Sequence, residues 1–219
     1  NVGPNKDSSN RINDYLIGLK TFHQVADYIT INISSPNTEN LRNFHNENEL
    51  NELLDKINQE KKILKTSVPL VIKISPDIED KKINKICDLL LKNEVKGLII
   101  SNTTDRNREN LININKLEKG GLSGKPLEEK SNLLINKFYK ILKNEIKIMG
   151  VGGVDSGKSA YKKIINGASV IQLYTGMVYE GPGIVSKISE ELIKILDKEG
   201  VKNISDIVGH KNWPWLATL

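Results

Sequence analysis

Short apolar runs rich in Ile and Val alternate along the chain with longer amphipathic stretches. This alternation is typical of βα units, in which helices connect the strands of a parallel sheet. Nearly continuous hydrophobicity at Leu98, Ile99 and Ile100, and again at Val170 and Ile171, indicates strands that are buried on both faces. We predict strands over residues 28–34, 68–74, 95–101, 146–151 and 169–175, and helices near residues 10–26, 48–64, 79–92, 128–143, 156–166 and 183–198.

The number of strands limits the possible architectures. A closed (β/α)8 barrel typically takes about 250 residues, whereas this chain has five clear strands in 219 residues and begins at Asn1 rather than at Met. We therefore expect an α/β fold, a (β/α)8 TIM barrel that is incomplete here because its first two to three strands are missing. An open doubly wound sheet is the alternative. Residues 1–219 are expected to form the C-terminal portion of a single domain.

Polar or small residues follow each predicted strand. The carboxyl ends of parallel strands meet at one edge of the sheet, where βα folds bind their ligands. Lys73 ends an apolar strand, where its charge would be costly to bury unless it faced an anion or an electron-rich cofactor. We expect five groups of residues to converge on one site: Asn32, Ser34 and Ser35; Lys73 and Asp77; residues 101–104; Gly152 and Gly153; Tyr174 and Thr175.

Composition and residue spacing exclude several classes of site. Lys and Arg total 32 against 27 Asp and Glu, but only four of the basic residues are Arg and only 5% of residues are aromatic, so we predict no nucleic-acid partner. Cys87 is the only cysteine and lies at helical spacing with apolar residues, which predicts a core position rather than a reactive thiol. The three histidines show no ligand spacing, so no metal site is expected.

Glycines at two strand ends have competing interpretations. Residues 152–159 match the P-loop pattern G-x-x-x-x-G-K-[ST] between a predicted strand and a helix, but the next strand ends without an acidic residue. Alternatively, the glycines after the strand ending at Val151 and those after Tyr174-Thr175 form a phosphate cradle from backbone N–H groups and a free helix N-terminus. The paired loops favour the cradle.

Residues 105–119, rich in Asn and charged side chains, interrupt the βα pattern. We predict a long surface loop here, a candidate lid over the site.

Six segments in this order and spacing resemble the class 2, quinone-linked dihydroorotate dehydrogenases over nearly the whole chain. They are residues 32–38 (NISSPNT), 71–77 (VIKISPD), 101–104 (SNTT), 120–124 (GGLSG), 150–154 (GVGGV) and 167–175 (GASVIQLYT). The resemblance implies an FMN-binding (β/α)8 barrel that oxidises dihydroorotate to orotate in pyrimidine (UMP) biosynthesis, with a quinone as electron acceptor.

Position by position, the resemblance implies roles for individual residues. Ser35 would be the catalytic base, in the position where class 1 enzymes have cysteine. A relay through Thr38 or a water would carry the proton onward. The resemblance also implies that Asn32, Asn37, Asn102 and Thr103 bind the substrate, and that Asn1, Asn32, Lys73, Ser101, Gly124, Gly153, Tyr174 and Thr175 contact FMN.

The chain departs from the family pattern at three points. Asn40 stands where the family has glycine, and Asn tolerates positive φ better than most residues. Ser101 replaces a common threonine and keeps the hydroxyl. The segments that supply further flavin and substrate contacts, and the helical segment by which class 2 enzymes meet quinone and membrane, have no counterpart here.

The resemblance therefore predicts a peripheral membrane protein, on the cytoplasmic side of a bacterial inner membrane or on a mitochondrial inner membrane. Residues 1–219 themselves are expected to be soluble and, alone, inactive. Another FMN-barrel pyrimidine oxidoreductase and the P-loop protein are the alternatives.

Overall fold

A computed structural model describes residues 1–106, 108–109 and 111–212. Its five strands are β1 (Ile29–Asn32), β2 (Leu70–Ile74), β3 (Gly97–Ile100), β4 (Lys147–Val151) and β5 (Ala168–Gln172). They form one sheet in the order β1-β2-β3-β4-β5, and every neighbouring pair is parallel. A doubly wound sheet reverses its strand order at a switch point. This sheet has none, so the doubly wound alternative is wrong and the predicted partial barrel is confirmed.

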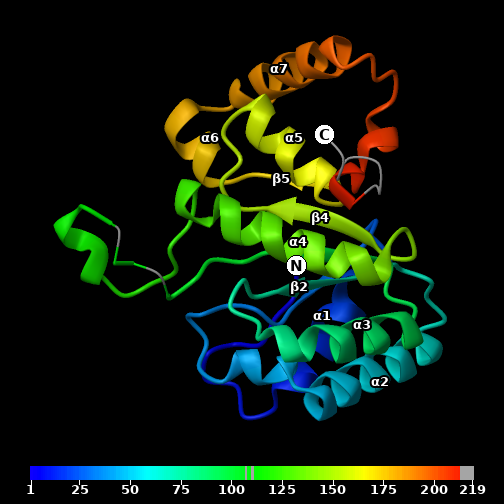
Figure 1. Cartoon of the computed structure of the whole chain (residues 1–219). Helices are drawn as coiled ribbons and strands as arrows, with labels where there is room; N and C mark the ends of the chain where they lie inside the picture. The colour runs from blue at the N-terminus through cyan, green and yellow to red at the C-terminus, as the bar shows by residue number, and fades with distance from the viewer. Residues whose placement is uncertain (107, 110, 213–219) are drawn as a thin grey trace.

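Helices follow the strands in the expected alternation, and Figure 1 shows them around the sheet in chain order. They are α1 (Arg11–Phe22), α2 (Glu47–Ile63), α3 (Ile83–Lys92), α4 (Glu128–Leu142), α5 (Gly157–Ile165), α6 (Thr175–Glu180) and α7 (Ile184–Lys198). The predicted strand over residues 169–175 is too long, because β5 ends at Gln172 and α6 begins at Thr175. None of the helices in the described part of the chain is long and apolar enough to span a membrane.

The core lies between the sheet and the helices. All four residues of β3 are buried, and the apolar stripe of α2 faces the sheet with Leu50, Leu53 and Leu54 fully buried. Cys87 is buried as predicted, and burial raises the pKa of its thiol to about 12. These contacts form one continuous cluster from Val2 to Ala168.

The predicted two-sided burial of β5 is wrong for Val170, which is 46% exposed. Ile171 packs against the core, so the preceding residue points to the opposite face of the strand. β5 is the last strand of the described sheet, so no neighbouring strand on that side helps to cover the face on which Val170 lies. At the other end of the sheet, Val2 pairs in parallel with Ile31 of β1, where a further strand would lie.

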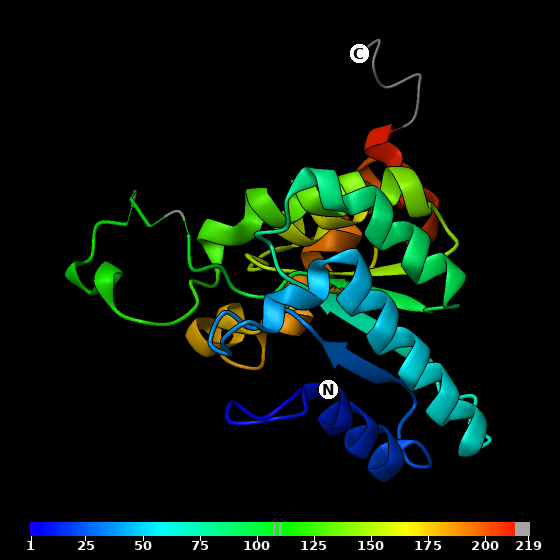
Figure 2. The ribbon, with the colours of Figure 1, turned by 90° about the horizontal axis from the view of Figure 1, so that it is seen from below.

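The predicted loop over residues 105–119 projects from the body of the molecule, as Figures 1 and 2 show. It contains a short 3-10 helix, Ile114–Leu117. Its base is closed by an antiparallel bridge between Thr104 and Leu122. Residues 107 and 110 of this loop and the Trp-Pro-Trp segment at 213–215 lie outside the described residues.

Candidate functional site

The ends of β1 and β3 are joined by a chain of side-chain hydrogen bonds. Ser34 Oγ donates to Asn32 Oδ1 (2.7 Å), and Asn102 Nδ2 donates to Ser34 Oγ (2.9 Å). The Thr103 amide donates to Asn102 Oδ1 (2.8 Å). Three predicted substrate residues, Asn32, Asn102 and Thr103, are thus brought together, and fully buried Ser34 is the link between them. Sequence reasoning assigned Ser34 to the converging cluster but gave it no role.

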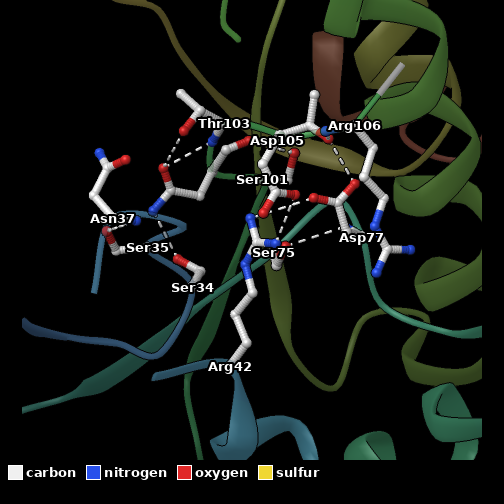
Figure 3. Close-up of polar contacts among 12 residues, drawn as sticks. Ser34, Ser35, Asn37, Arg42, Ser75, Asp77, Ser101, Thr103, Asp105 and Arg106 are labelled. Atoms are coloured by element: carbon white, nitrogen blue, oxygen red, sulfur yellow. Dashed lines mark hydrogen bonds and ion pairs between the residues drawn. The ribbon is translucent and has the colours of Figure 1, made fainter. Parts of the chain in front are cut away.

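Ser35 and Asn37 lie on the loop that leaves β1, and Figure 3 shows them beside this chain. The Asn37 amide donates to Ser35 Oγ (3.2 Å), so the serine hydroxyl keeps its own hydrogen for another acceptor. No carboxylate or imidazole in the described part of the chain hydrogen-bonds to Ser35. A proton taken up by Ser35 would therefore leave through Thr38 or water, and the relay stays a prediction.

A cavity of about 430 Å³ opens at the ends of β2 to β5. Burial lowers the pKa of Lys73, and no carboxylate of the described residues pairs with it. A half-buried ammonium without a counter-ion suits an anionic or electron-rich ligand. Six of the predicted cofactor residues line this cavity: Lys73, Ser101, Gly124, Gly153, Tyr174 and Thr175. Of the other two, Asn1 is exposed and Asn32 is half-buried at the end of β1.

The glycines beside the cavity are required by local geometry. Gly153 has φ +76°, and a Cβ there would lie 2.6 Å from Glu128 Cβ. Gly124 has φ +77°, and a Cβ there would lie 2.9 Å from Thr175 Cγ2. No backbone hydrogen bond of the described residues uses the N–H groups of Gly152 and Gly153. Unused N–H donors on a turn that lines the cavity are what a phosphate cradle needs.

Two helices follow the paired loops, and α5 is not the one that can supply the free N-terminus of the predicted cradle, which leaves α6. The Gly157 amide donates to Glu191 Oε2 of α7 (2.7 Å), so a carboxylate already occupies the start of α5. Ser159, the last residue of the P-loop match, is buried and forms a capping box with Ser156. These contacts exclude phosphate from the position that a P-loop requires.

A buried ion cluster under the same strand ends was missed by sequence analysis. The Asp77 side chain is 1% exposed and lies 3.3 Å from Arg42 Nη2, and it also pairs with Lys130. Thr104 Oγ1 donates to Asp77 Oδ1 (2.7 Å), and Arg42 pairs with Asp105 at 3.0 Å. Figure 3 shows Arg42 reaching between Asp77 and Asp105. The cluster joins the loops after β1, β2 and β3, and in the sequence only Asp77, after an apolar strand, signalled it.

His45 lies next to this cluster, buried in the 3-10 helix Leu41–His45. Its Nε2 accepts a hydrogen bond from the Ser75 amide (3.4 Å), which requires an unprotonated nitrogen. Burial, together with the nearby charge of Arg42, lowers the pKa of His45 to about 4. Asn40, at the start of this helix, has φ +54°, so it does adopt the conformation predicted for the family's glycine.

Comparison with known proteins gives consistent matches. The family model for dihydroorotate dehydrogenase matches residues 1–196. Dihydroorotate dehydrogenase (quinone) of Bartonella tribocorum is 42% identical over 98% of this chain and 61% of its own length. The Idiomarina loihiensis protein of the same name is 44% identical over 88% of this chain and 59% of its own length. The chain thus spans about three fifths of the length of these relatives.

Solved structures agree. Ligand-free DHODH from Eimeria tenella has a TM-score of 0.93 and 35% identity, covering 98% of this chain and 64% of its own. DHODH from the same organism in complex with ferulenol has a TM-score of 0.92 and 34% identity, covering 97% of this chain and 61% of its own.

We expect Asp77→Asn to lower the free energy of unfolding by about 1.5 to 3 kcal/mol, because it removes the buried carboxylate that half-buried Arg42 and Lys130 share, while Arg42 keeps Asp105. Asp80→Asn is the matched control: Asp80 is 72% exposed and, among the described residues, pairs only with exposed Lys137, so its loss should cost less than about 1 kcal/mol. Urea unfolding of the full-length gene product measures both. Equal effects of the two substitutions would contradict a structural role for the buried cluster.

His45 makes stability depend on pH. Its folded pKa of about 4 lies below the ordinary value of 6.5, so between these values the unfolded chain binds a proton that the folded chain does not. The free energy of unfolding should therefore fall as pH drops from 6.5 to 4, by on the order of 3 kcal/mol from this residue. His45→Gln should remove that part of the slope. Parallel profiles for the two proteins would refute the assignment.

Proposed function

Because this chain belongs to the dihydroorotate dehydrogenase family, we propose that it forms the main part of the active site of an enzyme that oxidises dihydroorotate to orotate. The proposed cofactor is FMN. The proposed final electron acceptor is a quinone, as in the names of the relatives. The reaction would serve pyrimidine biosynthesis. The observation that carries the proposal is the position of the cavity, with cofactor residues from four strand ends beside the linked asparagines.

The cavity suits FMN in two respects. The Gly152–Gly153 turn lines the cavity and offers unused N–H groups, which suit a phosphate. At the far end, Lys73 and Ser101 line the same cavity, where a positive charge and a polar hydrogen-bonding group suit the flavin ring. When bound, FMN would supply the hydride acceptor for the substrate.

The substrate would lie where the asparagines meet. Dihydroorotate carries ring amides and a carboxylate, and Asn side chains both donate and accept hydrogen bonds. Ser34 holds Asn32 and Asn102 through 2.7 and 2.9 Å contacts, so these amides are oriented before any ligand binds. Such orientation contributes to the rate by reducing the entropy lost on reaching the reactive geometry. Asn37 and Thr103 would complete the substrate contacts.

Ser35 would act as the catalytic base on the substrate C5 proton. Its Oγ accepts only the Asn37 amide in the described structure, so a second lone pair is available for that proton. An ordinary serine hydroxyl is a weak base, which is why the proton must pass onward as it is taken up. Thr38 is half-buried three residues along the same loop and is the proposed next carrier.

Quinone and membrane contacts are proposed to lie outside residues 1–219. The corresponding location is a peripheral one on a bacterial or mitochondrial inner membrane. The cavity at the ends of β2 to β5 is proposed for the first half-reaction, the reduction of FMN by dihydroorotate.

Anaerobic mixing of the full-length, FMN-loaded gene product with dihydroorotate tests the proposal. Flavin absorbance should bleach and return on addition of a quinone. Bound flavin that dihydroorotate does not bleach would remove the substrate assignment and favour another pyrimidine oxidoreductase. A protein without flavin would refute the proposal as a whole.

Ser35→Ala should slow this bleaching by about 10² to 10⁴, the usual contribution of a general base, while FMN stays bound. Ser189→Ala is the matched control, because Ser189 is exposed on α7 and its hydroxyl donates to the Val185 carbonyl of the same helix. Stopped-flow absorbance measures both rates. An unchanged rate in Ser35→Ala would exclude this serine as the base.

A further inference from the structure

Lys163 of α5 is a fully buried lysine that the proposed reaction does not use. Its side chain is 0% exposed, and its Nζ donates to Ser131 Oγ (3.1 Å) and Asn132 Oδ1 (3.0 Å), both on α4. Glu128 of α4 is the carboxylate whose charge acts on Lys163, but it forms its ion pairs with Lys125 and Lys162. A buried ammonium held only by neutral acceptors is unfavourable, and an apolar side chain of similar size would serve the fold as well. The role of Lys163 therefore depends on the groups to which its ammonium donates.

The hydrogen bonds that begin at Lys163 have a fixed direction. An ammonium has three donors and no acceptor, so Ser131 Oγ must accept from it. The single hydrogen of Ser131 is then left for a carbonyl, and Val151 O lies 2.6 Å away, closer than Ile100 O at 3.4 Å. Lys163 thus acts through Ser131 on the carbonyl at the carboxyl end of β4.

The Val151 carbonyl belongs to the same planar peptide unit as the Gly152 amide. In a trans peptide the C=O and N–H groups point in opposite directions. The Ser101 amide donates to the same carbonyl at 3.2 Å, and the Ser131 hydroxyl holds it from the α4 side at 2.6 Å. Together they set the direction of the Gly152 N–H, which faces away from α4, and the peptide plane from which the Gly152–Gly153 turn starts. Val151, Gly152 and Gly153 all line the cavity.

The hydrocarbon stem of Lys163 supports the same strand end. A Cβ on Gly150 would lie 3.1 Å from Lys163 Cδ and 2.9 Å from Ala168 Cβ. A Cβ on Gly152 would likewise lie 3.4 Å from Ser131 Cβ. Lys163 and Ser131 are thus packed directly behind the glycine-rich turn that follows β4.

We propose that Lys163 is a positioning residue for phosphate binding: acting through Ser131, it holds the Gly152–Gly153 turn in the conformation that receives the phosphate of the flavin. The inference rests on the proposed function, because it takes FMN as the ligand of this cavity. Lys163 does not touch the ligand, and its effect is confined to the phosphate end of the site.

Comparison of FMN with riboflavin, which lacks the phosphate, tests this role in the flavin-stripped full-length gene product. Quenching of flavin fluorescence gives both dissociation constants. Lys163→Met should weaken FMN binding by about tenfold, the usual scale for an unmet buried hydrogen bond, and leave riboflavin binding within about twofold. Lys158→Met is the matched control, because Lys158 is exposed on the same helix, and it should change neither constant.

Ser131→Ala keeps the buried lysine and should produce the same selective loss of FMN affinity. This variant tests the proposal even if Lys163→Met does not fold. The double variant should lose little more than either single one, because both substitutions break one chain of contacts. Equal weakening of FMN and riboflavin, or no weakening of either, would overturn the positioning role while leaving the proposed function intact. A parent protein that binds neither flavin would overturn both.

Discussion

Parallel pairing of strands in chain order decides which residues of this protein meet. With β1 to β5 side by side and all parallel, their carboxyl ends lie along one edge, and segments as far apart as residues 32 and 175 contribute to one region. The apolar side chains of α2 to α4 hold the sheet in place from the helix side. Every feature of the site, from the asparagine chain to the glycine turn, depends on this arrangement.

Two buried charges stabilise that edge in different ways. Asp77 is surrounded by Arg42, Lys130 and a threonine hydroxyl, so its charge is balanced and three loops are joined. Lys163 donates to two neutral acceptors, Ser131 and Asn132, and its hydrogen bonds lead through Ser131 to a backbone carbonyl beside the cavity. The ions around Asp77 fit a role in holding the loops together. The hydrogen bonds of Lys163 fit a role in orienting the peptide group between Val151 and Gly152.

Local patterns in the sequence were sufficient for the positions of the strands, apart from the end of β5, for the main helices and for the converging strand ends; the positive φ of Asn40 followed from the residue type and the family resemblance. These features depend on hydrophobic period and on residue conformation, which neighbouring residues determine. The contacts that sequence analysis missed are between segments distant in the chain: Arg42 with Asp77, Glu191 with the start of α5, and Lys163 with Ser131. Nothing local distinguishes Lys163 from exposed Lys162 beside it, because only the packing of α5 on α4 buries one and not the other. The exposure of Val170 likewise follows from the edge position of β5 rather than from its own sequence.

The central claim is that one cavity at the ends of β2 to β5 holds FMN, with the substrate beside it at Asn32 and Asn102. A crystal structure of the full-length gene product with FMN and orotate tests it most directly. We expect the phosphate against the Gly152–Gly153 turn, the flavin ring beside Lys73, and orotate within hydrogen-bond distance of both asparagines. Flavin bound elsewhere, with this cavity empty, would contradict the account.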